Sequence, residues 1–327
     1  MDLHYSTTRI RGRDILVPWT QISGRNVIVT GRFIRTAAVQ DETCVEGEIA
    51  PNPHEFVARL KEWEIKPDVF TFSQKVTDTK PRFHYKLEWD SFAVIPITSY
   101  DDWLYKRARP DVRHNIRKAQ KQGIIIRSVQ FDDKFVQGIK EIYDECPVRQ
   151  GMRFWHYGKT LEEIKNISGT YISRADYIGA YLGDELIGFV KLVYVGEIAR
   201  TMGVISKHKY FHLRPTNALI ARAVELCEQR NISHLVYGEY RFAGKSNSSL
   251  TDFKKRNGFE EVLCPRYFVP LTTKGNLAIK MGLHNGIRRC VPEPLGHGLL
   301  KLRSWTYGLL ATIGWTRLST TRQEQLP

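Results

Sequence analysis

The sequence of 327 residues is poor in the features that mark secreted, membrane-spanning and metal-binding proteins. It has only five cysteines, and no two of them stand at the short spacing of a zinc site. This pattern argues against a cysteine-based metal centre, so we expect no metal, and it favours a reducing, cytoplasmic compartment. The first residues, MDLHYSTTRIRGRD, contain no apolar stretch of the kind that a secretory signal needs. The longest weakly apolar run, Trp305–Trp315, is too short to cross a bilayer.

Acidic residues are also scarce, since 35 Asp and Glu stand against 49 Lys and Arg, for a net charge of +14. Such an excess favours an anionic partner, namely nucleic acid, a phosphate-bearing cofactor or an anionic membrane. Residues 271–327 alone carry eight basic and two acidic side chains. Within them, Leu295–Ile313 is amphipathic and includes Trp305 and Tyr307. Two interpretations stay open for this segment: peripheral contact with an anionic membrane, or packing on the folded domain.

The rest of the chain has ordinary globular composition, with 42% hydrophobic and 26% charged residues. The pattern predicts strands over Asn26–Val39 and Phe83–Ile97, with a helix over Pro53–Glu64 between them. Helices are predicted again near residues 132–145 and 160–167, followed by three strands joined by glycine turns. The helix Pro215–Gln229, the strand 234–240, the short helix Leu250–Arg256 and further strands complete a mixed α/β layout.

Three segments carry a resemblance to a known family. They are RHNIRKAQKQGIIIRSV (Arg113–Val129), LRPTNALIARAVE (Leu213–Glu225) followed by HLVYGEY, and LTDFKKRNGF (Leu250–Phe259). In their order and spacing, residues 100–270 resemble the GNAT acyltransferases, in the branch of the Fem-type aminoacyl transferases and related cell-envelope acetyltransferases. The resemblance implies a GNAT fold, a mixed sheet flanked by helices, built as two tandem halves. We expect a degenerate half at 1–130, the acyltransferase domain at 131–270 and a basic amphipathic tail at 271–327.

The resemblance also implies a donor site for acyl-CoA. In a GNAT enzyme the donor lies between two splayed parallel strands, with its pyrophosphate at the N-terminus of the intervening helix. Carried onto this chain, the donor-binding residues are Met202, Gly203, Val204, Arg214, Thr216, Asn217, Ala218, Lys254 and Lys255. The loop departs from the family because it lacks glycine, so we expect Thr216 and Asn217 to crowd a pyrophosphate. The alternative is an ordinary helix start.

Acyl transfer to an amine requires a base for the ammonium proton and hydrogen-bond donors for the oxyanion. Glu239, at the end of a predicted strand, is the candidate base. Tyr237 and Tyr240 are candidates to raise its pKa by desolvation or to protonate the leaving group. The alternative is a strand-end glutamate in solvent. If the strand bulges at Met202 and Gly203, their N–H groups are the expected oxyanion donors. The sequence shows no convincing Ser-His-Asp or Cys-His arrangement, which favours direct attack in a ternary complex.

Two basic segments are candidates for binding the acceptor. The first is a loop with arginines and aromatic side chains, which suit a sugar face and an anionic group: Arg149, Arg153, Trp155, His156 and Tyr157. Its alternative is a loop held by aromatic packing. The second is a helix opened by Pro110, where Arg113 and Arg117 share one face. We expect phosphate contacts there, or alternatively a solvated face.

Together these features predict a cytoplasmic N-acyltransferase that moves an acyl group from acyl-CoA to an amine of a cell-envelope saccharide or peptidoglycan-type precursor. An aminoacyl-tRNA-dependent Fem-type transferase is the first alternative, although the sequence lacks the long heptad-bearing arm of several such enzymes. A non-catalytic basic binding protein on a GNAT scaffold is the second alternative.

Overall fold

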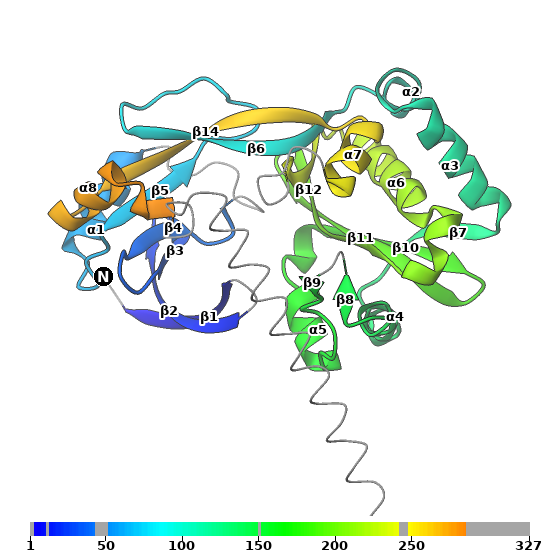
Figure 1. Cartoon of the computed structure of the whole chain (residues 1–327), viewed down its shortest axis with the longest axis horizontal. Helices are drawn as coiled ribbons and strands as arrows, with labels where there is room; N and C mark the ends of the chain where they lie inside the picture. Colours follow the sequence, from blue (N-terminus) through cyan, green and yellow to red (C-terminus); the bar gives the residue numbers. More distant parts are fainter. Residues whose placement is uncertain (1–2, 11–12, 43–51, 150–151, 242–247, 286–327) are drawn as a thin grey trace, which may run out of the picture.

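The computed structural model describes residues 3–10, 13–42, 52–149, 152–241 and 248–285. Within these ranges, twelve strands form one mixed sheet in the order β1-β2-β3-β4-β5-β14-β6-β13-β12-β11-β10-β7. The sheet curves through two halves that lie side by side, the first half on the left of Figure 1 and the second on the right. A separate two-stranded ribbon, β8-β9, lies below the second half.

The first half is an antiparallel meander followed by a helical crossover to a parallel strand. Its elements are β1 (His4–Ile10), β2 (Arg13–Ile22), β3 (Arg25–Thr30), β4 (Thr36–Val39), α1 (Pro53–Glu62) and β5 (Val69–Ser73). Strand β5 pairs in parallel with β4, from Thr36↔Val69 to Ala38↔Thr71.

The second half repeats this plan. It begins with α2 (Tyr100–Asp102), the π-helix η2 (Trp103–Arg107), α3 (Pro110–Lys121) and β7 (Ile124–Val129). The helical layer below it follows, with α4 (Asp133–Tyr143), β8 (Val148–Arg149), β9 (Met152–Arg153), α5 (Leu161–Ser168) and η3 (Ile172–Arg174). The meander and crossover are β10 (Ala175–Leu182), β11 (Glu185–Val195), β12 (Ile198–Ser206), η4 (His208–Leu213), α6 (Pro215–Gln229), β13 (His234–Glu239) and α7 (Ser249–Arg256). Strand β13 returns parallel to β12 after the crossover helix α6. The topology therefore has the two tandem halves that the sequence predicts.

Two long strands join the halves. β6 (Lys86–Pro96) and β14 (Glu260–Pro270) pair antiparallel along most of their length. β14 also pairs with β5 of the first half, and β6 pairs with β13 of the second. The last described elements, α8 (Thr273–Lys280) and η6 (Leu283–Asn285), follow β14 at the outer end of the first half (Figure 1). The predicted boundaries near residues 130 and 270 remain predictions, and residues 286–327 of the predicted tail lie outside the described ranges.

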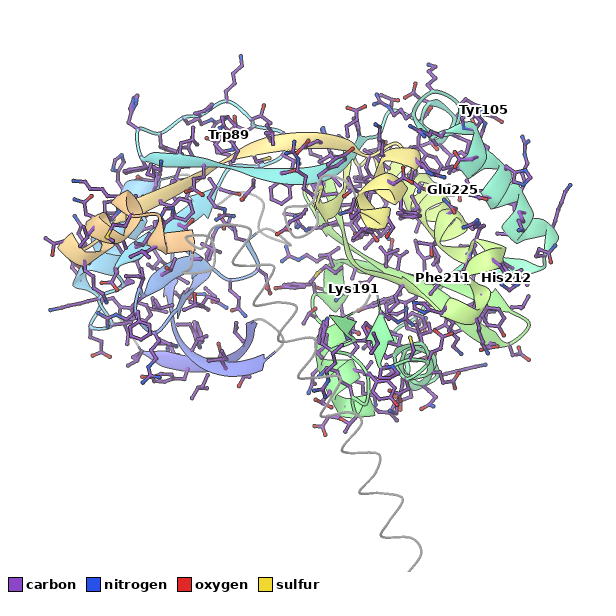
Figure 2. The ribbon with its side chains drawn as sticks, in the orientation of Figure 1. Trp89, Tyr105, Lys191, Phe211, His212 and Glu225 are labelled. Atoms are coloured by element: carbon purple, nitrogen blue, oxygen red, sulfur yellow. The ribbon has the colours of Figure 1, made fainter. Side chains whose placement is uncertain are left out.

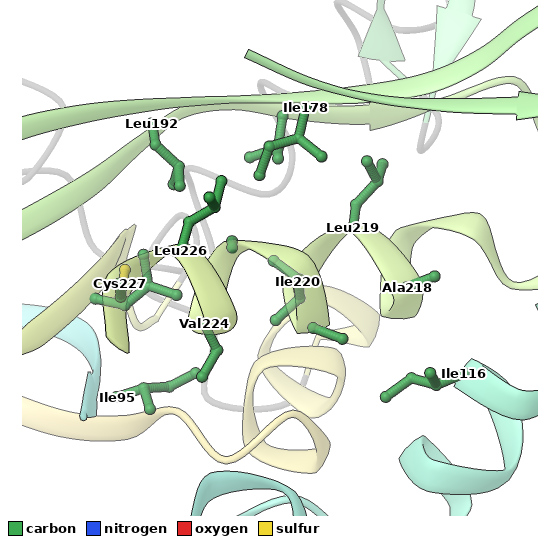
Figure 3. Close-up of a cluster of buried hydrophobic side chains, with 14 of the residues drawn as sticks. Ile95, Ile116, Ile178, Leu192, Ala218, Leu219, Ile220, Val224, Leu226 and Cys227 are labelled. Atoms are coloured by element: carbon green, nitrogen blue, oxygen red, sulfur yellow. The ribbon is translucent and has the colours of Figure 1, made fainter. Parts of the chain in front are cut away.

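Side-chain alternation builds the two layers of the second half. Ile178 and Leu192 point from the sheet toward α6, in the largest apolar cluster. Figure 3 shows them above Leu219 and Leu226 of α6, with Ile116 of α3 on the opposite side of the helix. The strand residues that alternate with them point to the other face of the sheet, where they contact α4. A strand buried on both faces has a nearly continuous apolar sequence, as β11 has. No helix among the described residues is long and apolar enough to cross a membrane.

Most predicted elements are confirmed, and one differs. The predicted strand Asn26–Val39 is two strands, because the chain turns after Thr30 at Gly31. A further helix precedes Pro110: it begins with Ser99 as its N-cap and widens into the π-helix η2. Residues in η2 pack against the end of α7, and the indole N–H of Trp103 donates to the carbonyl oxygen of Asn257 at 2.8 Å.

Gly258 allows this packing. Its φ is +79°, and a Cβ there would lie 3.1 Å from both the carbonyl carbon and the Cβ of Arg107. Gly123, which follows α3, has nearly the same φ of +78° but has no atom within 4 Å of such a Cβ. A substitution at either glycine therefore has the same cost from the left-handed backbone, and only a substitution at Gly258 adds the cost of steric crowding.

We expect Gly123→Ala to lower the free energy of unfolding by about 1 kcal/mol, through the left-handed backbone alone. Gly258→Ala should cost about 1–3 kcal/mol more, because the added methyl group overpacks the contact with Arg107. Urea unfolding of the two variants measures the difference. Equal losses would show that η2 does not pack closely on the end of α7.

Candidate active site

The two central parallel strands of the second half separate from each other. β12 and β13 pair only from Ile198↔His234 to Arg200↔Val236, yet β12 continues to Ser206 and β13 to Glu239. Where they part, the hydroxyl of Thr201 donates to the carbonyl oxygen of Tyr237 at 3.3 Å. Beyond this point the strands present backbone groups to the space between them. This gap is at the position that the resemblance assigns to the donor.

Strand β12 bulges beside the gap. Val204 pairs with Val190 and Thr201 pairs with Leu192, so two residues, Met202 and Gly203, face the single residue between those partners on β11. Gly203 has φ +116°, which a side chain would disfavour. The bulge at Met202 and Gly203, on which the expected oxyanion donors depend, is therefore present. The role of these N–H groups, like the donor-binding role of Val204, remains a prediction.

Lys254 closes the β13 side of the gap. It is 2% exposed, its ammonium donates to the carbonyl oxygen of Glu239, and its Nζ lies 5.0 Å from the ring centroid of Tyr237. Burial lowers the pKa of this lysine to about 8, against the opposing charge of Glu239. The neighbouring Lys255 is exposed. The structure thus separates two lysines that the sequence placed together.

The three predicted catalytic side chains have different environments. Glu239 is exposed at the end of β13. Tyr237 packs edge-on against Phe259, and burial raises the pKa of its hydroxyl. Tyr240 lines a separate pocket of about 620 Å³, which Lys255 also lines. Proximity to the gap therefore favours Glu239 and Tyr237 over Tyr240, and the catalytic assignment remains a prediction.

Two side chains at the N-terminus of α6 are hydrogen-bonded within the protein. Thr216 Oγ1 lies 3.0 Å from the hydroxyl of Ser206, and the amide of Asn217 donates to Asn257 Oδ1 at 3.1 Å. Asn217 and Ala218 are buried. The expectation that Thr216 and Asn217 crowd a pyrophosphate at this end remains a prediction. Arg214, in the left-handed conformation at φ +63°, is exposed.

Two carboxylates hold the loop before α6 in place. Glu145 accepts from the backbone N–H groups of His208 and Lys209, at 2.6 and 3.0 Å. Glu185 forms an ion pair of 2.6 Å with the buried Lys207 and accepts from Tyr210. Lys207 and the hydrogen bonds of Glu185 lower the pKa of this carboxyl to about 2, although burial opposes the shift. Charged contacts therefore fix a loop that has no glycine.

The predicted acceptor residues fall into a half-buried and an exposed group. Arg149 donates to the carbonyl oxygens of Ser206 and Ile142 at 2.9 and 3.0 Å. His156 stacks on Tyr143, with ring centroids 4.1 Å apart. The remaining three are exposed, namely Arg153, Trp155 and Tyr157, and the Trp155 ring also contacts His156. The ligand-binding role of these residues remains a prediction.

The two predicted cations of α3 also differ. Arg113 donates to the carbonyl oxygens of Leu104 and Ala108, at 2.9 and 3.4 Å, and so braces η2. Arg117 is exposed. Helix α3 lies against η4 and α6, so Arg117 is on the same layer of the molecule as the α6 N-terminus.

The equivalent gap in the first half is closed, which the sequence analysis missed. β4 and β5 stop pairing after Ala38↔Thr71, and the carboxylate of Glu42 accepts from the backbone N–H of Ser73 just beyond. Arg266 lies 3.2 Å from the same carboxylate. Burial raises the pKa of Glu42 to about 7, with Arg266 opposing. The first half thus fills its own gap with a side chain.

A second feature missed from the sequence is a buried lysine on β11. Lys191 faces the bulge of β12 and is 1% exposed. Its ammonium donates to the carbonyl oxygen of Ser168 at 3.0 Å, and burial lowers its pKa to about 8. Tyr171 beside it donates to Asp41 of the first half. Figure 2 shows Lys191 on the side of the second half that faces the first. No signal in the sequence separates it from an ordinary strand lysine.

Among the described residues, no group of three or more His, Cys, Asp or Glu side chains is arranged to hold a metal ion. The structure does bring Cys146 and His208 together, with Sγ and Nδ1 3.8 Å apart, a pair that the sequence analysis did not find. This contact lies at the end of α4.

No protein-family model matches the sequence, and no curated protein matches it. Several solved structures share its fold. FemX aligns with a TM-score of 0.56 at 10% identity, over 85% of this chain and 90% of FemX. L-PGS from Bacillus licheniformis aligns at 0.53 and 12%, over 77% and 83%. The C-terminal domain of a putative lysylphosphatidylglycerol synthetase from Agrobacterium fabrum aligns at 0.50 and 12%, over 85% and 87%. The predicted fold is therefore confirmed: the chain has the GNAT-type, Fem-like fold.

Proposed function

We propose that this protein is an acyltransferase that binds an acyl-CoA donor in the gap between β12 and β13 of its second half. The observation that carries the proposal is the contrast between the halves. In the second half the strands part beside a bulge in β12, and the ammonium of Lys254 binds the end of β13. The first half fills the equivalent gap with Glu42. One chain then binds one donor.

The side chains around the gap supply the chemistry of direct transfer. The acceptor amine attacks the thioester carbonyl, a C–N bond forms, and the N–H groups of Met202 and Gly203 stabilise the oxyanion. Glu239 takes the ammonium proton. The C–S bond then breaks, and Lys254 gives its proton to the departing sulfur. A lysine with a pKa near 8 suits this step, because it is charged at neutral pH yet loses its proton readily.

The remaining residues suit a phosphate-bearing donor and a polar acceptor. Arg214 is exposed beside the N-terminus of α6, where backbone N–H groups suit a pyrophosphate, and Thr216 and Asn217 are held by hydrogen bonds within the protein. The exposed Arg153, Trp155 and Tyr157 suit a sugar with an anionic group. We therefore propose an amine of a cell-envelope saccharide or peptidoglycan-type precursor as the acceptor.

A second candidate function is transfer from an aminoacyl-tRNA. The observation that favours it is a set of exposed cations near the α6 N-terminus, with Arg117 and Lys121 on α3, which packs on α6, and Arg214 at the start of α6. Phosphate contacts of this kind give a steep dependence of binding on salt. Binding of charged tRNA that weakens steeply with salt, in a protein that does not bind acyl-CoA, would favour this candidate.

Donor binding is tested by stabilisation of the protein. A ligand at 100 times its dissociation constant adds about 2.7 kcal/mol to the free energy of unfolding. We expect acetyl-CoA, or a longer acyl-CoA, to raise the melting temperature, and Glu239→Gln to keep this shift while losing turnover. The absence of a shift with every acyl-CoA would exclude this donor. If Glu239→Gln left the protein's activity unchanged, a non-catalytic binding protein would be favoured.

The two adjacent lysines of α7 test the catalytic assignment. We expect Lys254→Met to lower kcat by about 100-fold or more, because a positioned proton donor is lost. Lys255→Met is the matched control for proton transfer: a role in donor binding alone would change KM for acyl-CoA, so this exposed lysine should leave kcat within about threefold of wild type. A steady-state assay with acyl-CoA and a panel of amines measures both. Similar losses in the two variants would contradict the role of Lys254.

The same variant changes the pH dependence of stability. The pKa of Lys254 is 10.5 before burial and about 8 in the folded protein, so between these values the unfolded chain binds more protons. The folded wild type therefore gains stability as pH rises from 8 to 10.5, and below pH 8 the cost of burying the charge is fully present. Urea unfolding at pH 7 and pH 10 should show a smaller gain for Lys254→Met. An unchanged gain would mean that Lys254 is not desolvated.

A further inference from the structure

The outward face of α8 carries large apolar side chains. Leu277 and Met281 stand four residues apart, and they are 58% and 59% exposed. Phe33, from the turn between β3 and β4, is 72% exposed and has the highest exposure among the large apolar side chains of the described residues. Exposed apolar groups that gather on one face indicate a contact surface.

The turn and the helix are in direct contact. The ammonium of Lys274 donates to the carbonyl oxygen of Phe33. Ile34 packs under them against the cluster of Val69, Phe268 and Ile279. Phe33 therefore lies beside the start of α8. We call this the α8 surface, and define it by Phe33, Leu277 and Met281 with the cations Arg32, Lys274 and Lys280.

The charges of the α8 surface have one sign. Helix α8, TKGNLAIK, has no acidic residue, and Lys280 and Arg32 are exposed. Lys274 forms an ion pair with Asp68 at 3.2 Å, but that carboxylate is 3% exposed whereas the lysine is 55% exposed. The charged groups of the α8 surface that are exposed to solvent are therefore cationic. Another exposed apolar pair, Trp89 and Leu263 on the joining strands, differs because Glu261 lies beside it (Figure 2 labels Trp89).

The position of α8 suits contact with an extended surface. It lies at the outer end of the first half, away from the second half (Figure 1). The chain then continues into residues 286–327, which carry six basic and two acidic side chains together with Trp305 and Tyr307. The α8 surface and this segment thus share a basic and apolar character.

We propose that the α8 surface docks on an anionic membrane, with Phe33, Leu277 and Met281 in the headgroup region and the three cations against acidic lipid. Apolar insertion and attraction of Lys and Arg to anionic headgroups act together at such surfaces. The long aliphatic stems of the lysines also pack along the apolar residues while their charges stay in the headgroup layer. This inference does not depend on the proposed enzymatic function.

The test measures binding of the full chain to vesicles by flotation. The vesicles are phosphatidylcholine alone, or phosphatidylcholine with 30% phosphatidylglycerol, at roughly 0.05 and 0.3 M salt, across which charge screening strengthens. We expect binding only to the anionic vesicles, weaker at high salt. The variant Phe33→Gln/Leu277→Gln/Met281→Gln should bind at least tenfold more weakly. Arg32→Gln/Lys280→Gln should reduce both the binding and its salt dependence.

The matched control is Trp89→Gln/Leu263→Gln, which removes a comparably exposed apolar pair and should bind like wild type. Circular dichroism checks that every variant is folded, and the exposed positions make this the expected result. Wild-type binding by the triple variant would overturn the proposal and assign any membrane contact to other residues. Failure of the wild type to bind anionic vesicles would also overturn it, and would leave the surface to a protein partner or to residues 286–327.

Discussion

The structure depends on one constraint, which is that two parallel strands separate and leave backbone groups without a strand partner. Buried N–H and C=O groups must be satisfied by something else. The protein meets this need differently in its two halves. In the first half, Glu42 supplies a carboxylate to the N–H of Ser73 and is itself held by Arg266. In the second half, Thr201 and Lys254 donate to carbonyl groups of β13, and β12 bulges where it leaves β13. One fold thus satisfies the separated strands with a carboxylate in one half and with a hydroxyl and an ammonium group in the other.

Specific contacts, several of them charged, hold the elements around the gap. Glu145 and Glu185 hold the loop before α6, and Arg149 ties the end of β12 to α4. Trp103 and Gly258 fix the end of α7, which carries Lys254. Buried ionic contacts are costly unless every partner is in place, so these networks specify one position for each element. The donor site proposed on these elements would need little rearrangement on binding, which reduces the entropy lost.

Local sequence patterns predicted the helices and strands well, whereas side-chain contacts between distant parts of the chain could not be predicted. Pro215, the apolar face of α6 and the glycine turns of β10 to β12 are local signals, and the elements they predict are present. The burial of Lys254 could also have been predicted, because it follows Leu250 by four residues and falls on the apolar face of α7, whereas Lys255 does not. The burial of Glu42 and Lys191 could not, because their partners lie far along the chain and an isolated charged residue is normally expected in solvent. Arg149 was assigned to a ligand for the same reason, since its carbonyl partners are invisible in sequence.

Donor binding between β12 and β13, with none in the first half, can be measured by hydrogen exchange of backbone amides with and without saturating acetyl-CoA, because protection reports the contacted strands. We expect slower exchange at residues 202–204 and 216–218, with no change at Ser73. Slower exchange at Ser73 and its neighbours, or unchanged exchange in both halves, would rule out this binding site.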